Sequence, residues 1–385
     1  MEEVEKKICL CMIVKNESKI IERCLNSAKG VIDCISICDT GSTDGTPEII
    51  KNWCKDKKIP GTVHFEPFKN FGYNRSKAVT LAKEAYPKSD YLLLLDADMV
   101  LEVSPEFNKN SLKQDQYLTM QYNRKIKYWL TRLLKTSLPW HSVGVTHEYW
   151  DIDRAKLPKE SFIYIDSKGK LDSLIVNDQE DGGSKTDKFE RDKQLLLQGL
   201  GDSKTPGFLR GRYMFYLAQT HMCLGEYAES IHWYKKRIEV GGWVEEIYYS
   251  LLQIGLCYDF IANSTESNEE SFALALHYFQ KAWETRPTRA EPLYHLARLH
   301  RINSNHHLGL LFASRGKEIP FPNEDILFVD YHVYEYLFDY EISICANYIK
   351  DKLEIGRAAQ KRLESMIDRL PDHLAVSVKN NARFY

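Results

Sequence analysis

Short apolar runs alternate with helical segments along the first part of the chain. The runs lie at residues 8–14, 34–38, 62–66 and 91–100. They are rich in Val, Ile, Leu and Cys and have the length of buried strands. The segments between them carry apolar residues at helical spacing, as Ile21 and Leu25 do, and Asn16 is expected to cap that first helix. This order of elements predicts an α/β domain with a Rossmann-like, mainly parallel sheet.

A purely helical pattern follows, and it repeats. Pairs of a large and a small residue recur at Leu217-Ala218, Ile254-Gly255 and Leu296-Ala297. Their spacing is close to the roughly 34-residue period of a tetratricopeptide repeat, which this pattern resembles. We therefore expect three parts: an α/β domain over 1–186, tetratricopeptide-like repeats over 187–320, and a helical cap over 321–385.

Such repeats bind peptides or other chains, so a protein partner or self-association is expected. The alternative is a scaffold that only supports the first domain.

The overall composition excludes some classes of partner. The net charge is −2, which gives no general attraction to nucleic acid, and no apolar run is long enough to span a membrane. The nine cysteines are scattered, several of them inside apolar runs, and none forms a C-x-x-C pair. We interpret them as reduced thiols. The start of the sequence lacks the basic region of a signal peptide, so a cytoplasmic protein is expected.

Polar residues gather where two of the predicted strands end. The stretch CDTGSTDGT, residues 38–46, follows the second strand, and DAD, residues 96–98, follows the fourth. Ligands of parallel sheets bind at the carboxyl ends of strands, so both stretches are expected to face a ligand. The plainer alternative for the first stretch is a turn in which Asp39 and Asp44 only cap backbone N–H groups.

Asp96 and Asp98 come directly after four leucines. A carboxylate beside a buried strand is costly unless something offsets its charge. Two such groups that face one point suit Mg²⁺ or Mn²⁺, which prefer carboxylate and phosphate oxygens. The alternative is a pair that simply faces water.

Three stretches, MIVKNE, DTGSTDGT and LLLLDADM, together resemble the nucleotide-sugar half of a GT-A glycosyltransferase of family 2. The resemblance covers residues 8 to about 185. It implies a nucleotide-diphosphate sugar as donor, with UDP as the expected nucleotide. The residues that it assigns to the nucleotide sugar are Val14, Lys15, Glu17, Asp39, Arg75, Asp96 and Ala97. Independently, the fork of N–H donors on an arginine such as Arg75 suits a diphosphate. The alternative is a solvated arginine at the start of a helix.

The resemblance also implies a chemistry. A metal held by Asp96 and Asp98 would stabilise negative charge on the leaving diphosphate. Family 2 enzymes invert the anomeric centre in one displacement, so one carboxylate base is enough to take the proton of the acceptor. We assign that base to Glu148, in the segment HEYW. The alternative is that His147 and Glu148 are a half-buried polar pair.

The third metal ligand stays open between His147 and Asp178. Relatives often place a histidine just before a DGG sequence, whereas this chain has Asn177 and Asp178 there.

Three functions from different classes remain. The leading one is a metal-dependent glycosyltransferase with a glycan, lipid, peptide or small-molecule acceptor. The second is a non-catalytic scaffold whose first domain is a relic. The third, a nucleotidyltransferase, is disfavoured because the first loop, VKNES, has no glycine.

Overall fold

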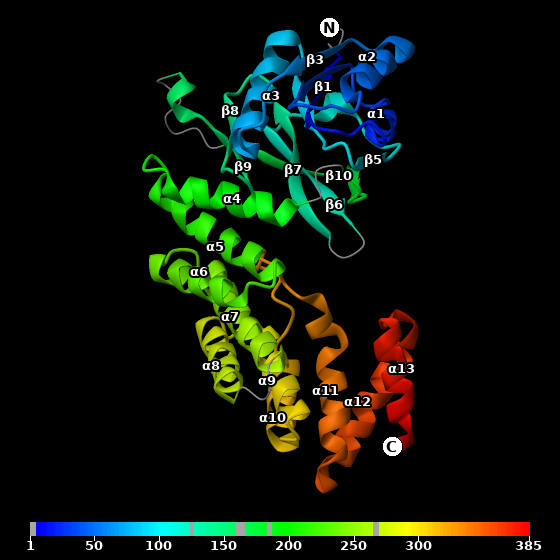
Figure 1. Ribbon diagram of the computed structural model, residues 1–385. Coiled ribbons are helices and arrows are strands. Elements are labelled where there is room, and N and C mark those ends of the chain that lie inside the picture. The colour runs from blue at the N-terminus through cyan, green and yellow to red at the C-terminus, as the bar shows by residue number, and fades with distance from the viewer. Residues whose placement is uncertain (1–4, 124–126, 159–165, 183–186, 265–268) are drawn as a thin grey trace. The chain divides into compact units, whose positions relative to one another are not determined.

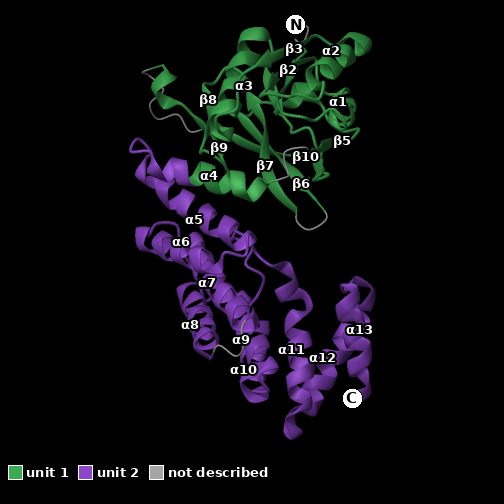
Figure 2. Cartoon of the chain, viewed as in Figure 1, with its two compact units in different colours: residues 1–196 green, residues 197–385 purple. Residues whose placement is uncertain are grey.

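The computed structural model describes residues 5–123, 127–158, 166–182, 187–264 and 269–385. The chain divides into two compact units, residues 1–196 and residues 197–385 (Figure 2). The boundary falls inside helix α4 (Lys188–Gly201), and residues 321–385 belong to the same unit as the repeats. The sequence-based division at residues 186 and 320 stays a prediction.

The first unit is built on an eight-stranded sheet in the order β3-β2-β1-β4-β7-β6-β10-β5 (Figure 1). The strands are β1 (Ile8–Val14), β2 (Cys34–Asp39), β3 (Gly61–Phe65), β4 (Tyr91–Leu94), β5 (Met99–Val103), β6 (Gln116–Tyr122), β7 (Lys127–Lys135) and β10 (Lys168–Asp178). Strands β3, β2, β1 and β4 are parallel, while β7 runs antiparallel to both of its neighbours. A two-stranded sheet of β8 (Trp140–Val143) and β9 (Tyr149–Ile152) completes the unit.

Both faces of the parallel half of the sheet are buried. Alternate residues of β1 point to opposite faces, as a strand requires. Ile8 and Leu10 join a cluster with helices α1 (Ile21–Ala28) and α2 (Thr46–Lys57). Cys9 and Cys11 face helix α3 (Phe71–Ala85) on the other side. All nine cysteines are free thiols.

Two expectations about local structure were wrong in detail. Asn16 does not cap α1, because its φ is +58° and the helix begins only at Ile21. The carbonyl of Glu17 accepts from the N–H of Ile21 at 2.9 Å instead. The fourth strand ends at Leu94, so the DAD stretch forms a turn before β5 rather than part of one long strand.

The second unit is helical, as the sequence predicted. Its α-helices are α5 (Gly207–Cys223), α6 (Tyr227–Val240), α7 (Val244–Ser264), α8 (Glu269–Thr285), α9 (Glu291–Ile302), α10 (His306–Lys317), α11 (Phe338–Asn347), α12 (Leu353–Ser365) and α13 (Asp372–Asn381). Consecutive helices pack as pairs: α5 with α6, α7 with α8, and α9 with α10.

The small residues of the repeat lie where paired helices meet. A Cβ added at Gly255 of α7 would lie 2.6 Å from the ring of Phe279 on α8. In the preceding pair, Ser230 of α6 donates from its hydroxyl to the carbonyl of Ala218 on α5 at 2.8 Å. These contacts explain the large-small pattern, and the tetratricopeptide-like repeats are confirmed.

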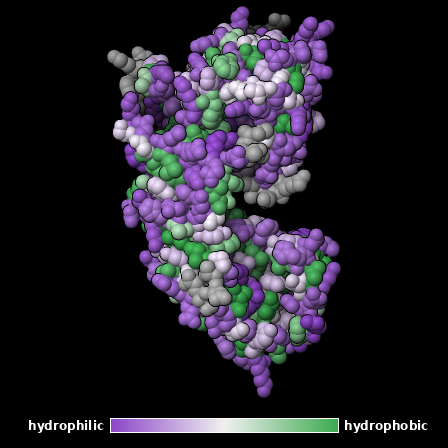
Figure 3. Space-filling model, in the orientation of Figure 1, coloured by the Kyte–Doolittle hydropathy of each residue, from purple (hydrophilic) through white to green (hydrophobic). Residues whose placement is uncertain are grey.

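Among the described residues, no helix has both the length and the apolar character to cross a bilayer. Hydrophilic residues predominate on the face of the first unit that Figure 3 shows.

Candidate functional site at the carboxyl ends of the parallel strands

The loops after β1 and β2 are joined by hydrogen bonds from the small polar residues. Thr43 N–H donates to Asn16 Oδ1 at 2.8 Å, and Glu17 N–H donates to Thr46 Oγ1 at 2.8 Å. Asp44 accepts from the N–H of Ser18 at 2.9 Å and from the hydroxyl of Thr46 at 2.6 Å. Burial alone would raise the pKa of Asp44, but these hydrogen bonds lower it to about 2. Much of the CDTGSTDGT stretch therefore fixes one loop to the other.

Asp39 is buried and faces its own loop. Its carboxylate lies 3.2 Å from the N–H of Ser42 and 3.3 Å from that of Gly41. Asp39 is not among the residues that line the adjacent cavity, whereas its neighbour Thr40 is. The contacts match the capping alternative, and a role of Asp39 in binding the nucleobase stays a prediction.

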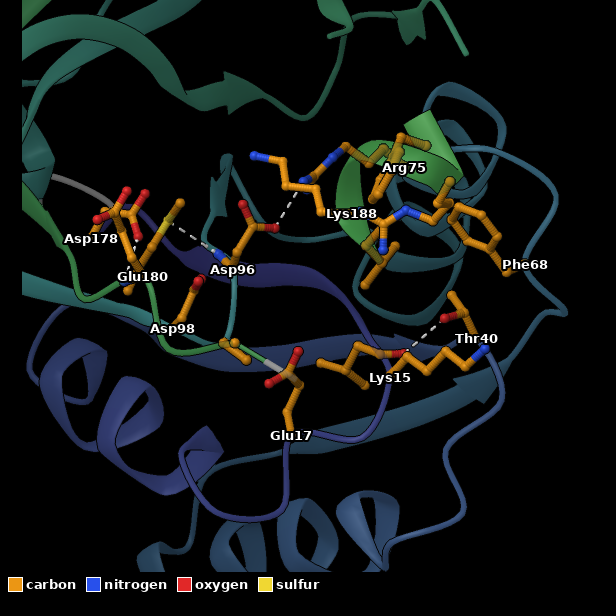
Figure 4. A pocket seen from close by; sticks show the side chains of 17 residues that line it. Lys15, Glu17, Thr40, Phe68, Arg75, Asp96, Asp98, Asp178, Glu180 and Lys188 are labelled. Atoms are coloured by element: carbon orange, nitrogen blue, oxygen red, sulfur yellow. Dashed lines mark hydrogen bonds and ion pairs between the residues drawn. The ribbon is translucent and has the colours of Figure 1, made fainter. Parts of the chain in front are cut away.

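A cavity of about 320 Å³ lies next to these loops, within the size range of small-molecule sites. Eight of the residues assigned from the sequence line it: Val14, Lys15, Glu17, Arg75, Asp96, Ala97, Asp98 and Asp178. The ends of β1, β4 and β10 and one face of α3 bring them together. Asp98, Asp178 and Glu180 lie on one side of the pocket, and Phe68 lies on the other (Figure 4).

The two carboxylates of the DAD turn have different surroundings. Asp96 pairs with Arg75 of α3 at 2.9 Å and lies 3.9 Å from Arg132 of β7. Burial alone would raise the pKa of Asp96, but the two guanidinium groups lower it overall. Asp96 is therefore held as an anion by arginines.

Asp98 lies under the segment that follows β10. The N–H of Gln179 donates to the carbonyl of Asp98 at 3.0 Å, and a Cβ at Gly182 would lie 3.0 Å from Asp98 Oδ2. Arg23 of α1 fixes the same segment through a two-pronged ion pair with Asp181, at 2.6 and 2.7 Å. Close approach of the chain to the Asp98 carboxylate accounts for the glycine at position 182.

The described residues contain no group of three or more His, Cys, Asp or Glu side chains that would hold a metal by themselves. Mg²⁺, however, is usually bound through one or two carboxylates, with water and substrate phosphates completing the shell. Asp98 and Asp178 both line the cavity and fit this smaller donor set. His147 is not among the lining residues and has a left-handed backbone, with φ +50°.

Glu148 is positioned by the segment before it. That segment packs on the first turns of α3, where a Cβ at Gly72 would lie 2.1 Å from the carbonyl oxygen of Gly144. The N–H of Phe71 donates to the carbonyl of Val145 at 3.0 Å. As a result, Glu148 Oε1 lies 2.6 Å from Arg75 Nε, so Glu148 contacts a lining residue without being one of the lining residues itself.

Arg75 thus links Glu148 to Asp96. Burial alone would lower the pKa of Arg75, but Asp96 and Glu148 raise it well above its ordinary value. The guanidinium is a permanent cation between two carboxylates.

Some residues of the site were missed by sequence reasoning. Arg132 is buried and donates to the side chain of Gln121, which in turn donates to Asp178 at 3.3 Å. Lys188 and Arg191 line the cavity from the first turn of α4, and the Arg191 guanidinium lies 5.1 Å from the centre of the Phe71 ring. The i, i+3 spacing of these two cations at a helix start was the available signal.

Residues 9–107 match the family model described as glycosyl transferase family 2. The SPbeta prophage-derived glycosyltransferase SunS of Bacillus subtilis is 40% identical over 88 residues, which are 23% of this chain and 19% of that protein. A TPR repeat-containing protein of Synechococcus elongatus is 32% identical over 121 residues, which are 31% of this chain and 27% of that protein. The matches thus cover less than a third of the length of either relative.

Among solved structures, TarS of S. aureus matches over 73% of this chain and 55% of its own, with a TM-score of 0.36 and 14% identity. A likeness at this level says nothing about the ligands of this chain.

Proposed function

We propose that the first unit transfers a sugar from a nucleotide-diphosphate donor to an acceptor. The match of residues 9–107 to the glycosyl transferase family 2 model supports this proposal. The observation that carries the proposal is the cavity at the carboxyl ends of β1 and β4. Asp96, Asp98 and Arg75 line it, and Arg75 also holds Glu148. The proposed donor is a UDP-sugar.

The charges around the cavity suit such a donor. Lys15, Arg75, Lys188 and Arg191 contribute cations from three different elements. A diphosphate needs several positive groups, and arginine offers a fork of N–H donors that matches phosphate oxygens. We assign Lys188 and Arg191 to the diphosphate, together with Arg75.

The proposed metal site uses Asp98 and Asp178, with Mn²⁺ or Mg²⁺ as the ion. When bound, the ion supplies a Lewis acid for the leaving diphosphate. Asp96 is assigned to the ribose and to orienting Arg75, because its carboxylate already forms ion pairs with Arg75 and Arg132.

Glu148 is the proposed base of a single, inverting displacement. Its charge-assisted hydrogen bond to Arg75 fixes the position of the carboxylate. In the proposed reaction Glu148 takes the proton of the acceptor hydroxyl or thiol as the acceptor oxygen or sulfur attacks the anomeric carbon. The bond from that carbon to the diphosphate breaks, and the electron pair leaves with the diphosphate.

The test is a panel of UDP-, GDP- and CMP-sugars, assayed for hydrolysis with and without Mn²⁺. We expect release of UDP from at least one sugar, dependent on the metal and lost in Asp98→Asn. No release from any donor, together with no binding, would favour the scaffold function. In that function the tetratricopeptide-like repeats recruit a protein partner, and the first unit is a relic.

A further inference from the structure

An extended segment connects α10 to α11, and it is bound by the repeats rather than exposed as a free loop. The segment is FPNEDILFVD, residues 321–330, and we refer to it as the strap (Figure 1). It contains no helix or strand. Its contacts come from the helices of the same unit, α5, α7 and α9, and from the connection between α8 and α9.

Two buried side chains bind the main chain of the strap. Glu245, at the start of α7, accepts from the N–H groups of Ile326 and Leu327 at 3.0 and 2.8 Å. Arg289, which is 0% exposed, donates to the carbonyls of Leu327 and Phe328 at 3.2 and 3.1 Å. Contacts of this kind hold an extended chain of any sequence, as the edge of a sheet does.

Alternate side chains of the strap make the contacts that depend on its sequence. Asp325 forms ion pairs with Arg286, whose Nε lies 2.6 Å away, and with Arg289 at 3.3 Å. Leu327 is buried in an apolar cluster with Phe215, Ala218 and Ile254. Ile326, between these two anchors, is 81% exposed, whereas the ring of Phe328, which is 45% exposed, lies 5.0 Å from that of Tyr249 on α7. The alternation over residues 325–327 is how extended peptides are read.

The strap is held although its own backbone is unfavourable. Phe328 has a φ of +44°, in the left-handed region that a bulky side chain rarely adopts. A chain that binds these groups without a left-handed residue would do so at a lower conformational cost.

We propose that this surface, made by Glu245, Arg286, Arg289 and the pocket of Leu327, is a peptide-binding site that the chain fills with its own strap. Its external ligand is an extended segment of a partner protein with an aspartate two residues before a leucine. The tethered strap competes at an effective concentration of the order of millimolar, so a partner peptide must displace it. This proposal is independent of sugar transfer.

The test uses the full chain and a fluorescent peptide of residues 321–330. In one variant, residues 324–329 are replaced by Gly and Ser at equal length. We expect this variant to bind the peptide at least about tenfold more tightly than the unchanged chain, by fluorescence anisotropy. A peptide with Asp325→Asn and Leu327→Ala should bind the variant about tenfold more weakly, because both anchors are removed.

Circular dichroism and gel filtration check that the variant is folded. If it is not, Asp325→Asn with Leu327→Ala in the otherwise intact chain replaces it, with the same expected order of affinities. Equal binding of the two peptides to a folded variant would overturn the proposal. So would a dimer that becomes a monomer when the strap is replaced, because the occupant would then be the strap of a second copy.

Discussion

Replacing Glu148 with Gln removes the proposed base and leaves the size and shape of the side chain nearly unchanged. If Glu148 accepts the proton of the acceptor, turnover should fall by about 10²–10⁴-fold, the usual contribution of general base catalysis. At about 1.36 kcal/mol for each tenfold change, this is roughly 2.7–5.4 kcal/mol of transition-state stabilisation. The Michaelis constant for the donor should change little.

The same substitution has a smaller effect on folding. It replaces a charge-assisted hydrogen bond of 2.6 Å, between side chains that are 16% and 19% exposed, with a neutral one. Because charge-assisted bonds are about twice as strong as neutral ones, the expected loss is about 1 kcal/mol of unfolding free energy. A loss of that size does not explain a hundredfold loss of turnover, so the two effects can be separated.

The assay is steady-state sugar transfer, or hydrolysis where no acceptor is known, with kcat and KM measured separately and stability followed by thermal unfolding. Glu66→Gln is the matched control, because Glu66 also accepts a hydrogen bond from a residue of α3, Tyr73, at 2.9 Å, whereas the α3 partner of Glu148 is Arg75, which lines the cavity. Near-normal turnover of Glu148→Gln, with turnover abolished in Asp178→Asn or Asp181→Asn at intact donor binding, would refute the assignment.

Three further predictions concern the metal, the repeats and the strap. Asp98→Asn should lower both donor affinity and turnover, and added Mn²⁺ should partly restore them in a metal titration of activity. Gly255→Ala should have a free energy of unfolding about 1–3 kcal/mol lower than the control Gly201→Ala, measured by unfolding in denaturant. The added methyl group would overpack against Phe279, whereas nothing lies within 4 Å of a Cβ at Gly201. Equal free energies of unfolding would contradict the contact between α7 and α8. Hydrogen bonds from Arg286 lower the pKa of Asp325 from its ordinary value of 3.8. The stabilisation of the folded chain by ionised Asp325 is therefore complete above pH 3.8 and is lost as the pH falls through the lowered pKa. The stability gap between the unchanged chain and Asp325→Asn should therefore close only below about pH 4, and a gap that closes between pH 5 and 7 would contradict this pairing.

Local patterns in the sequence were enough to predict the parallel half of the first unit and the repeats. Apolar runs of strand length are visible along the chain, and the large-small pairs mark where Gly255 meets Phe279. The order β7-β6-β10-β5 was not predictable in the same way, because β10 pairs with β6 and β5, which are far from it in the sequence. Such pairings depend on contacts between distant residues, which a reading of local periodicity does not contain.

At the candidate site, too, local sequence patterns did not reveal contacts between distant residues. Arg132 lies in a strand, and a charged residue in a strand usually indicates an exposed position. It is buried here because Asp96, in the turn after β4, and Gln121, on β6, lie next to it. The sequence near Arg132 contains no sign of these partners. The Asn16 prediction was wrong for a related reason, since its side chain binds Thr43 in the next loop instead of the first turn of α1. In both positions a partner from a distant part of the chain overrides the local preference.

Binding of UDP with Mn²⁺ to the full chain, compared with Asp98→Asn by calorimetry and thermal unfolding, tests the central claim most directly. We expect stabilisation of about 2.7 kcal/mol at a hundredfold excess over the dissociation constant. The stabilisation should be larger than that given by GDP or CMP and should be weakened in Asp98→Asn. A larger effect of GDP or CMP would contradict the choice of UDP. If no nucleotide stabilises the chain at millimolar concentration, with or without the metal, the cavity is not a nucleotide-sugar site and the account is wrong.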